Sequence, residues 1–253
     1  MAIAESIAFL ALRFSLALGG GQKRIIASLD SINARLNALE SSTSFIKQLI
    51  IEGDKDSLNN VFNTIYKTNA WGSGSGPGSD ETLCAGYVAF LQDFFKTHKI
   101  KSIVDCGCGD WQFSKNIDFS GISYKGFDVA DFVISQNNAK YKKENVNFFL
   151  YNGDFSTLPS ADLIICKDVL QHLPNAKIKE FIDNLHKFRF ALITNDISGY
   201  YGDELTNADI MIGGYRALDL RDEPFNLHCN VVHSIVRMPY APNMLVMLWE
   251  RQR

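Results

Sequence analysis

Acids and glycines at the ends of short hydrophobic runs are the residues of this chain best suited to chemistry. Asp105 ends one β-branched run, and Gly107 and Gly109 follow it at alternate positions. Asp128 ends a second run, nineteen residues after Gly109. Glycines let a backbone turn tightly and approach a ligand closely, and an acid at the tip of the next strand can accept hydrogen bonds from ribose hydroxyls. The spacing therefore predicts a nucleotide-type ligand at this turn.

Further motifs make the pattern more specific. Residues 105–110 read D-x-G-x-G-D, Asp128 follows, and Asn152-Gly153-Asp154-Phe155 comes after the next hydrophobic run. This ordered set resembles the class I S-adenosylmethionine-dependent methyltransferases, whereas D-x-G-x-G alone would also fit a dinucleotide-binding enzyme. The resemblance covers roughly residues 79–253 and says nothing about the segment before them.

The resemblance implies S-adenosylmethionine as the cofactor and gives roles to the acids and glycines. Asp105 would contact the amino end of the methionine moiety, directly or through water, and Asp128 would bind the ribose. Gly107 and Gly109 would let the backbone pass close to the methionine tail and the ribose. These four residues form the predicted core of the cofactor site.

Three further residues are predicted to contact the cofactor. By the same resemblance, Asp154 faces the adenine amino group, and Phe155 stacks on the ring or offers its backbone amide. Trp71 opens the glycine- and serine-rich segment 71–79. Such a segment is either a linker or a loop that closes over a ligand. We expect Trp71 to contact the cofactor.

Candidates for catalysis lie after the fourth and fifth expected strands. A hydroxyl is a poor nucleophile at neutral pH and needs a general base or a metal ion. His172 resembles the histidine of an H-L pair common among small-molecule methyltransferases, and it is the preferred base; the alternative is packing under the cofactor. Asp168 and Asp196 end two strands and could share Mg²⁺ or Mn²⁺ with Asn195, as in some sugar and antibiotic O-methyltransferases. Equally, Asp168 could cap a helix and Asp196 could serve a turn.

Candidates for substrate binding lie in residues 197–228, which hold no convincing helix. A long irregular stretch between core strands often shapes a substrate site. Tyr200, Tyr215 and Arg216 are the residues we expect to contact the acceptor there. Arg216 offers a fork for a phosphate or carboxylate, or else it forms a surface ion pair.

The elements that must position these residues alternate along the chain. Strands are predicted at 102–106, 122–128, 146–150, 161–166 and 189–194, and helices at 131–141 and 174–187. Strands alternating with helices indicate a parallel sheet covered on both faces. Residues 231–237 and 244–250 are typical of an antiparallel pair, and the resemblance implies the same ending. The predicted fold is a doubly wound, Rossmann-like α/β sheet of seven mostly parallel strands with an antiparallel C-terminal strand, preceded by N-terminal helices.

The N-terminal part of the chain has helical periodicity. Apolar residues from Ile25 to Ile50 step by 4 and 3, which predicts a coiled coil and a homo-oligomer. A single amphipathic helix lying on its own domain is the alternative. The stripe within residues 3–17 predicts helix packing, or alternatively an interfacial membrane helix. We therefore divide the chain into a helical oligomerisation segment, 1–52, and a catalytic domain, 53–253. Within the latter we expect a helix over 53–69 and Ser79 as the N-cap of the next helix.

Composition excludes several classes of protein. The 253 residues carry a formal net charge of −3, which argues against a protein dominated by contacts with nucleic-acid phosphates. Five cysteines are present, and their one C-x-C pair has no second pair to complete a zinc site. Reduced thiols and the lack of a basic residue before the first apolar stretch predict a cytoplasmic protein without a secretory signal.

We expect an O-methyltransferase that acts on a small polar acceptor, namely a sugar or nucleotide-linked sugar of a bacterial capsule or other surface polysaccharide. This acceptor rests on the likeness of W-G-S-G-x-G-P-G-S and G-G-Y-R-A-L-D-L to segments of glycan-locus methyltransferases. N-methylation of a small amine is one alternative. A coiled-coil scaffold that binds the cofactor without catalysis is the other.

Overall fold

The computed structural model describes residues 57–197, 207–236 and 244–252. The predicted coiled-coil segment 1–52 lies outside the described residues, so the proposed division of the chain stays a prediction. None of the helices in the described ranges combines the length and the hydropathy that a bilayer span requires.

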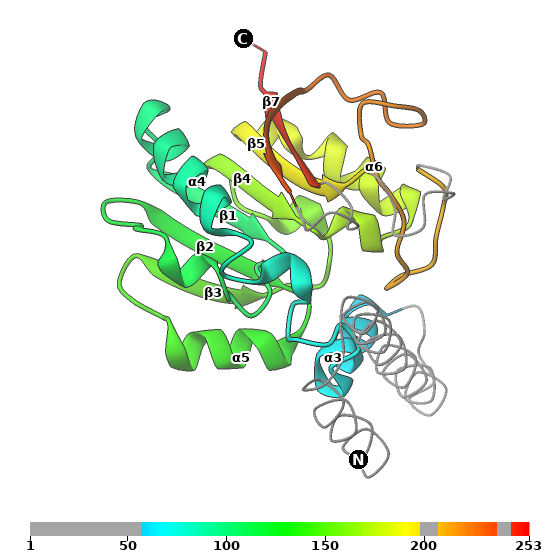
Figure 1. Cartoon of the computed structure of the whole chain (residues 1–253), viewed down its shortest axis with the longest axis horizontal. Coiled ribbons are helices and arrows are strands. Elements are labelled where there is room, and N and C mark those ends of the chain that lie inside the picture. Colours follow the sequence, from blue (N-terminus) through cyan, green and yellow to red (C-terminus); the bar gives the residue numbers. More distant parts are fainter. Residues whose placement is uncertain (1–56, 198–206, 237–243, 253) are drawn as a thin grey trace, which may run out of the picture.

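The predicted sheet of seven strands is confirmed, with the order β3-β2-β1-β4-β5-β7-β6 (Figure 1). The strands are β1 (Ser102–Cys106), β2 (Ser123–Asp128), β3 (Val146–Leu150), β4 (Ala161–Lys167), β5 (Phe188–Asp196), β6 (Asn230–Ile235) and β7 (Met244–Glu250). The described α-helices are α3 (Leu58–Thr68), α4 (Ala85–Thr97), α5 (Asp131–Lys140) and α6 (Asn175–Asp183). Strands β1 to β5 are parallel, and β7 runs antiparallel between β5 and β6.

The order of the strands sets where a ligand can bind. From β1 the chain passes to β2 and β3 on one side, and then returns to β4 and β5 on the other side. Loops from β1 and β4 therefore diverge, which leaves a crevice at the carboxyl ends of these two strands. The motif residues of the sequence end β1, β2 and β4 and so meet at this edge.

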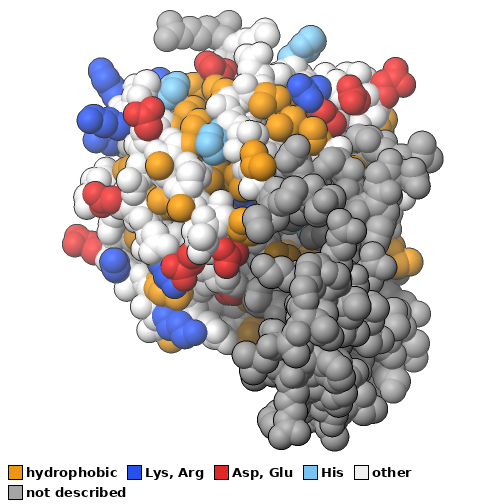
Figure 2. Space-filling model, in the orientation of Figure 1, with side chains coloured by type: hydrophobic (Ala, Val, Ile, Leu, Met, Phe, Trp, Pro, Cys, Tyr) orange, Lys and Arg blue, Asp and Glu red, His pale blue; other side chains and the backbone are white. Residues whose placement is uncertain are grey.

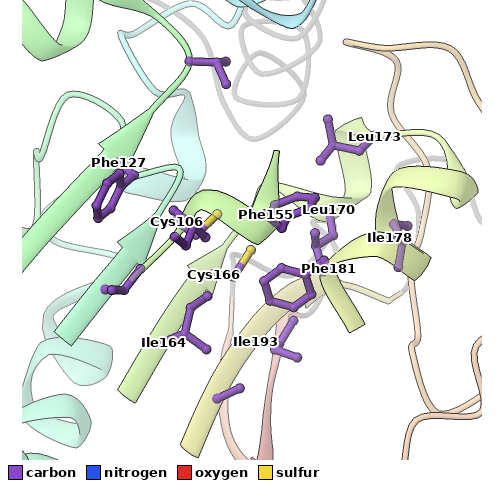
Figure 3. Packing of buried hydrophobic residues seen from close by; sticks show 14 of the residues in the cluster. Cys106, Phe127, Phe155, Ile164, Cys166, Leu170, Leu173, Ile178, Phe181 and Ile193 are labelled. Atoms are coloured by element: carbon purple, nitrogen blue, oxygen red, sulfur yellow. The ribbon is translucent and has the colours of Figure 1, made fainter. Parts of the chain in front are cut away.

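Hydrophobic side chains cover both faces of the sheet. Val104 and Cys106 belong to one buried cluster, together with Ile178 and Phe181 of α6, whereas Ile103 belongs to a second cluster with residues of α4. Figure 3 shows part of the first cluster, where Cys106 of β1 and Cys166 of β4 lie close to Phe155 and Phe181. Because alternate residues of a strand face opposite sides, burial on both faces explains the nearly continuous apolar runs.

Two local predictions were wrong. Ser79 does not cap a helix: it ends a 3₁₀ turn (Pro77–Ser79), and α4 begins only at Ala85. The Asp80 carboxylate accepts hydrogen bonds from the backbone amides of the two residues 82 and 83, and such local bonds compete with helix formation. The helix expected over 174–187 ends at Asp183 and is followed by a 3₁₀ turn over 185–187, whose Lys187 ammonium donates to backbone carbonyls near residue 155.

Charged side chains are mixed over the visible surface. On the face shown in Figure 2, the acidic and basic side chains of the described residues are interspersed, and hydrophobic side chains gather between them. A protein that tracks a nucleic-acid backbone would carry its basic residues in one patch or stripe. On this face the basic side chains of the described residues are instead spread among acidic ones.

The coiled-coil prediction can be tested directly. Full-length protein should be oligomeric, because the seam of residues 25–50 buries its apolar side chains by pairing with the same seam of another chain. A protein of residues 53–253 should contain fewer chains per particle. Light scattering of both chains measures this. A monomeric full-length protein, or an unchanged oligomeric state after truncation, would contradict the coiled coil.

Candidate active site

A cleft opens at the carboxyl ends of β1, β2 and β4, where the order of the strands predicts one. Its walls come from α3, the segment after α3, the turn after β1, and the ends of β2 and β4. About 840 Å³ of space not filled by protein atoms lies within it, open solvent at its mouth included. Its lining combines carboxylates with apolar and aromatic side chains, which suits a ligand that has both polar and apolar parts.

The glycine turn after β1 forms the floor of the cleft. Gly107 has φ of 77° and Gly109 has φ of 55°, in the left-handed region that favours glycine. A Cβ atom at Gly107 would lie 2.3 Å from Val169 Cγ2, and one at Gly109 would lie 2.3 Å from Ser75 Oγ. Both glycines are thus required by backbone conformation and by the close approach of neighbouring segments.

Asp128 fixes this turn and faces the cleft. Its carboxylate accepts hydrogen bonds from the backbone amides of Gly109 (3.0 Å) and Ala130 (2.9 Å). Burial raises the pKa of Asp128 to about 6, although the backbone hydrogen bonds oppose the rise. Since each carboxylate oxygen has two acceptor positions, both oxygens can still accept a hydrogen bond from a ligand.

Asp105 lies at the end of a buried polar chain. The Tyr124 hydroxyl donates to Asp105 Oδ2 at 2.6 Å, and Trp111 Nε1 donates to the same hydroxyl at 2.8 Å. Burial raises the pKa of Asp105 to about 7. Neither aromatic partner was predicted from the sequence. Tyr124 lies on β2 in register with Ile103 of β1, two residues before Asp105. Pairing of these two predicted strands would therefore have placed Tyr124 near Asp105.

The glycine- and serine-rich segment is docked on the cleft rather than extended as a linker. Trp71 lines the cleft, and its ring lies 5.8 Å from that of Tyr66. Ser75 Oγ accepts a hydrogen bond from the Asp110 amide (2.9 Å), and the Ser75 amide donates to Asp110 Oδ2 (3.2 Å). The Tyr66 hydroxyl lies 2.9 Å from Ser75 Oγ. The segment thus closes one side of the cleft, while contact of Trp71 with the cofactor stays a prediction.

Lys167 and Asp168 form the end of β4, and both line the cleft. The Lys167 ammonium donates to the Gly78 carbonyl (2.8 Å) and to Asp168 Oδ2 (2.6 Å). Asp168 has φ of 57°, an uncommon conformation for a non-glycine residue that occurs often at functional sites. Lys167 was not predicted as a site residue from the sequence, because a lysine at a strand end usually extends its ammonium into solvent.

His172 lies beside the cleft, next to Trp71. Its ring is buried and lies 5.1 Å from the Trp71 ring, and its Nδ1 is 2.7 Å from the Gly214 carbonyl oxygen. Because a carbonyl only accepts, Nδ1 carries the proton and Nε2 holds the lone pair, 3.5 Å from Gln171 Nε2. Burial lowers the pKa of His172, so the ring is neutral at pH 7. His172 is absent from the described lining of the cleft.

Asp196 and the three predicted substrate residues do not form one group in the structure. Asp196 Oδ2 accepts a hydrogen bond from the Tyr215 hydroxyl at 2.7 Å. Arg216 is buried and donates to backbone carbonyls, including that of Gln171 at 3.2 Å, so its fork holds the 3₁₀ turn of residues 170–172. Desolvation lowers the pKa of Arg216 to about 10. Tyr200 lies outside the described residues.

The predicted adenine contacts are divided between the surface and the cleft. Phe155 is buried and lines the cleft. Asp154 is exposed and caps the following turn by accepting a hydrogen bond from the Ser156 amide at 2.8 Å. Hydrogen bonding by the Ser156 side chain and then by its amide lowers the pKa of Asp154. Its contact with adenine stays a prediction.

A metal ion at Asp168 and Asp196 gains no support from the geometry. Asp168 is paired with the Lys167 ammonium, and Asp196 with the Tyr215 hydroxyl. Among the described residues, no group of three or more histidine, cysteine, aspartate or glutamate side chains is placed to hold a metal ion.

Comparisons with known proteins bear on this fold and cleft. Residues 103–188 match the family profile of a methyltransferase domain. The methyltransferase domain of bacterial CtHen1 is 11% identical, with a TM-score of 0.51 over 67% of this chain and 100% of that one. PigF with SAH is 12% identical, with a TM-score of 0.54 over 84% of this chain and 68% of that one. A search of curated proteins gave no match.

The profile match falls on the strands that build the cleft. This part of the chain is a class I methyltransferase domain. Its cofactor is S-adenosylmethionine, and the reaction it catalyses is transfer of the cofactor's methyl group. The two solved structures support the fold of the methyltransferase, and their low identities leave its acceptor open.

Proposed function

We propose that the methyltransferase transfers the methyl group to a hydroxyl of a sugar or nucleotide-linked sugar used for a bacterial surface polysaccharide. One observation carries the O-methylation: the Asp168 carboxylate lines the cleft beside the glycine turn, at the switch between β1 and β4. A hydroxyl acceptor needs a base at the point where the sulfonium presents its methyl group. Asp168 supplies a carboxylate there.

The cleft accommodates the parts of S-adenosylmethionine in a consistent order. Asp128 accepts hydrogen bonds from the ribose hydroxyls, and Asp105 pairs with the methionyl ammonium. Leu58, Val129 and Phe155 offer apolar surface for adenine at the β2 side of the cleft. The sulfonium then lies between the glycine turn and the end of β4, within reach of Asp168.

Asp168 replaces His172 as our preferred base. Asp168 lines the cleft, while His172 lies against Trp71 and uses Nδ1 on the Gly214 carbonyl. We therefore assign His172 the task of positioning Trp71. Tyr215 extends the same group, because its ring lies 5.9 Å from that of His172.

The sugar acceptor is supported by the meeting of two segments far apart in the sequence. Segment 71–79 and segment 213–220 both contact the turn of residues 170–172, through Trp71 on His172 and through the Gly213 amide on the His172 carbonyl (2.9 Å). These are the two segments whose sequences resemble glycan-locus methyltransferases. Aromatic rings beside hydrogen-bonding groups suit a sugar, which has both apolar faces and hydroxyls.

Incubation of the full chain with labelled S-adenosylmethionine and an array of nucleotide sugars tests the proposal. Transfer of label to a sugar hydroxyl is the expected result. Transfer only to small amines would instead establish the N-methyltransferase alternative. Tight cofactor binding without transfer to any acceptor would favour the non-catalytic scaffold.

Cofactor affinity should depend on pH through Asp105. Burial raises its pKa to about 7, and the methionyl ammonium favours the ionised carboxylate. Below that pKa the cofactor must displace a proton, so affinity for S-adenosylhomocysteine should rise about tenfold between pH 6 and pH 8. Calorimetry across this range measures the rise, and Asp105→Asn should flatten it. A flat profile in the unmodified protein would place the ammonium elsewhere.

A further inference from the structure

Lys167 carries a positive charge in a cleft that otherwise contains acids. Of the described side chains that line the cleft, it is the only basic one, beside Asp105, Asp128 and Asp168. Only 8% of its surface is exposed. Burial of an ammonium group is costly unless it is paired and hydrogen-bonded. Asp168 supplies an anionic partner, and together with the Gly78 carbonyl it accounts for only part of the hydrogen bonding of the ammonium.

Strand register places Lys167 beside Asp105. Asp105 of β1 is aligned with Ile165 of β4, and Lys167 follows Ile165 by two residues. Residues two apart on a strand face the same side, so Asp105 and Lys167 share one face of the sheet at its carboxyl edge. The Lys167 charge also opposes part of the rise that burial causes in the pKa of Asp105, which is expected of neighbours.

The ammonium group has a donor to spare. It has three N–H bonds, and two of them go to the Gly78 carbonyl and to Asp168 Oδ2. The Phe113 ring lies 5.4 Å from Nζ and limits access from its side. One donor is left for an anionic group in the cleft.

We propose that Lys167 binds the methionyl carboxylate of the cofactor while Asp105 binds the ammonium on the same carbon. This inference rests on the cofactor placement given under the proposed function. An α-amino acid has its two opposite charges on one carbon atom, and the neighbouring Asp105 and Lys167 present the complementary charges in the same cleft. The pair therefore recognises the zwitterion.

The same ammonium links cofactor binding to the segment over the cleft. Gly78 belongs to segment 71–79, whose Ser75 is bonded to the glycine turn. A carboxylate bound to Lys167 would hold its ammonium group in place. The ammonium group would in turn hold the Gly78 carbonyl through their hydrogen bond. The cofactor thus strengthens the closure of its own site.

Calorimetry with three ligands on the full chain tests the proposal. S-adenosylhomocysteine carries both charges, its decarboxylated analogue keeps the ammonium only, and methylthioadenosine carries neither. The unmodified protein should bind the decarboxylated analogue about 10–150-fold more weakly than S-adenosylhomocysteine, the range for a hydrogen bond to a charged group. Lys167→Met should bind these two ligands alike and bind methylthioadenosine as the unmodified protein does. Lys140→Met, at an exposed lysine on α5, is the matched control and should keep the full difference.

Two results would overturn the proposal. One is an unmodified protein that binds S-adenosylhomocysteine and its decarboxylated analogue with equal affinity. This measurement does not depend on whether any variant folds. The other is a Lys167→Met protein that keeps the full difference in affinity between S-adenosylhomocysteine and its decarboxylated analogue. If the turnover of this variant also falls, Lys167 serves the acceptor and not the cofactor carboxylate. Lys167→Arg retains the charge and should restore part of the difference. Failure of the acceptor assay would leave these affinities unchanged, so the proposed sugar acceptor and the carboxylate site are tested separately.

Discussion

Replacement of Asp168 by asparagine should reduce methyl transfer by roughly 10²–10⁴-fold, the usual contribution of a general base. Asparagine keeps the shape of the side chain and can still accept a hydrogen bond from Lys167, but it cannot take the acceptor's proton. Affinity for S-adenosylhomocysteine should change little, because no cofactor group is assigned to Asp168. Single-turnover rates and calorimetry measure the two effects. Asp183→Asn, at an exposed residue on α6, is the matched control.

His172→Ala separates the two candidate bases. If His172 positions Trp71, its removal should raise the KM for the acceptor and leave the pH profile of the rate unchanged, since no titrating base is lost. A loss of 10²-fold or more in kcat after His172→Ala, together with a mild effect of Asp168→Asn, would restore His172 as the base.

A chelator distinguishes both of these bases from a metal mechanism. The Lys167 ammonium already pairs with Asp168, so the proposed mechanism needs no divalent cation at this carboxylate. Activity should therefore survive extensive treatment with chelator. Activity that disappears with chelator and returns with magnesium or manganese would assign the central role to a metal at Asp168 and Asp196.

The sequence predicted the sheet well because each parallel strand is buried on both faces. Such strands appear as compact apolar runs that end at a polar residue, as at Asp105 and Asp128, and their ends are aligned at one edge of the sheet. Sequence periodicity can therefore locate the strands, and the end residues then locate the ligand cleft. Helix starts were less predictable, because local side-chain bonds such as those of Asp80 decide them.

Side chains that act across the fold were not predictable from the sequence. Arg216 resembled a substrate fork, yet three of its donor contacts go to the turn of residues 170–172 and to Asn175. Lys167 resembled an ordinary strand end, yet it lies in the cleft because Gly78, 89 positions earlier, covers it. Sequence spacing does not report contacts of this separation, so the roles of these two cations emerge only from the folded chain.

Asp128→Ala should weaken the binding of S-adenosylmethionine by about 1–3 kcal/mol, or roughly 5–150-fold, the range for loss of a hydrogen bond to a buried charged group. The substitution removes the ribose acceptor, and it also removes the acceptor of the Gly109 and Ala130 amides. Asp128→Asn keeps one oxygen for these amides and should lose most of the ribose contact alone. Asp93→Ala, at an exposed site on α4, controls for loss of a carboxylate.

A modified ligand separates the ribose contact from the support of the turn. S-adenosylhomocysteine that lacks its 2′-hydroxyl should bind the unmodified protein more weakly than the complete ligand, because the ribose-binding carboxylate then lacks one of its two partners. Asp128→Asn should bind the two ligands with nearly equal affinity. If Asp128→Asn instead keeps the full difference, another residue holds the 2′-hydroxyl. The carboxylate would then serve only to fix the glycine turn, and the assignment of the motif acid to the ribose would be lost.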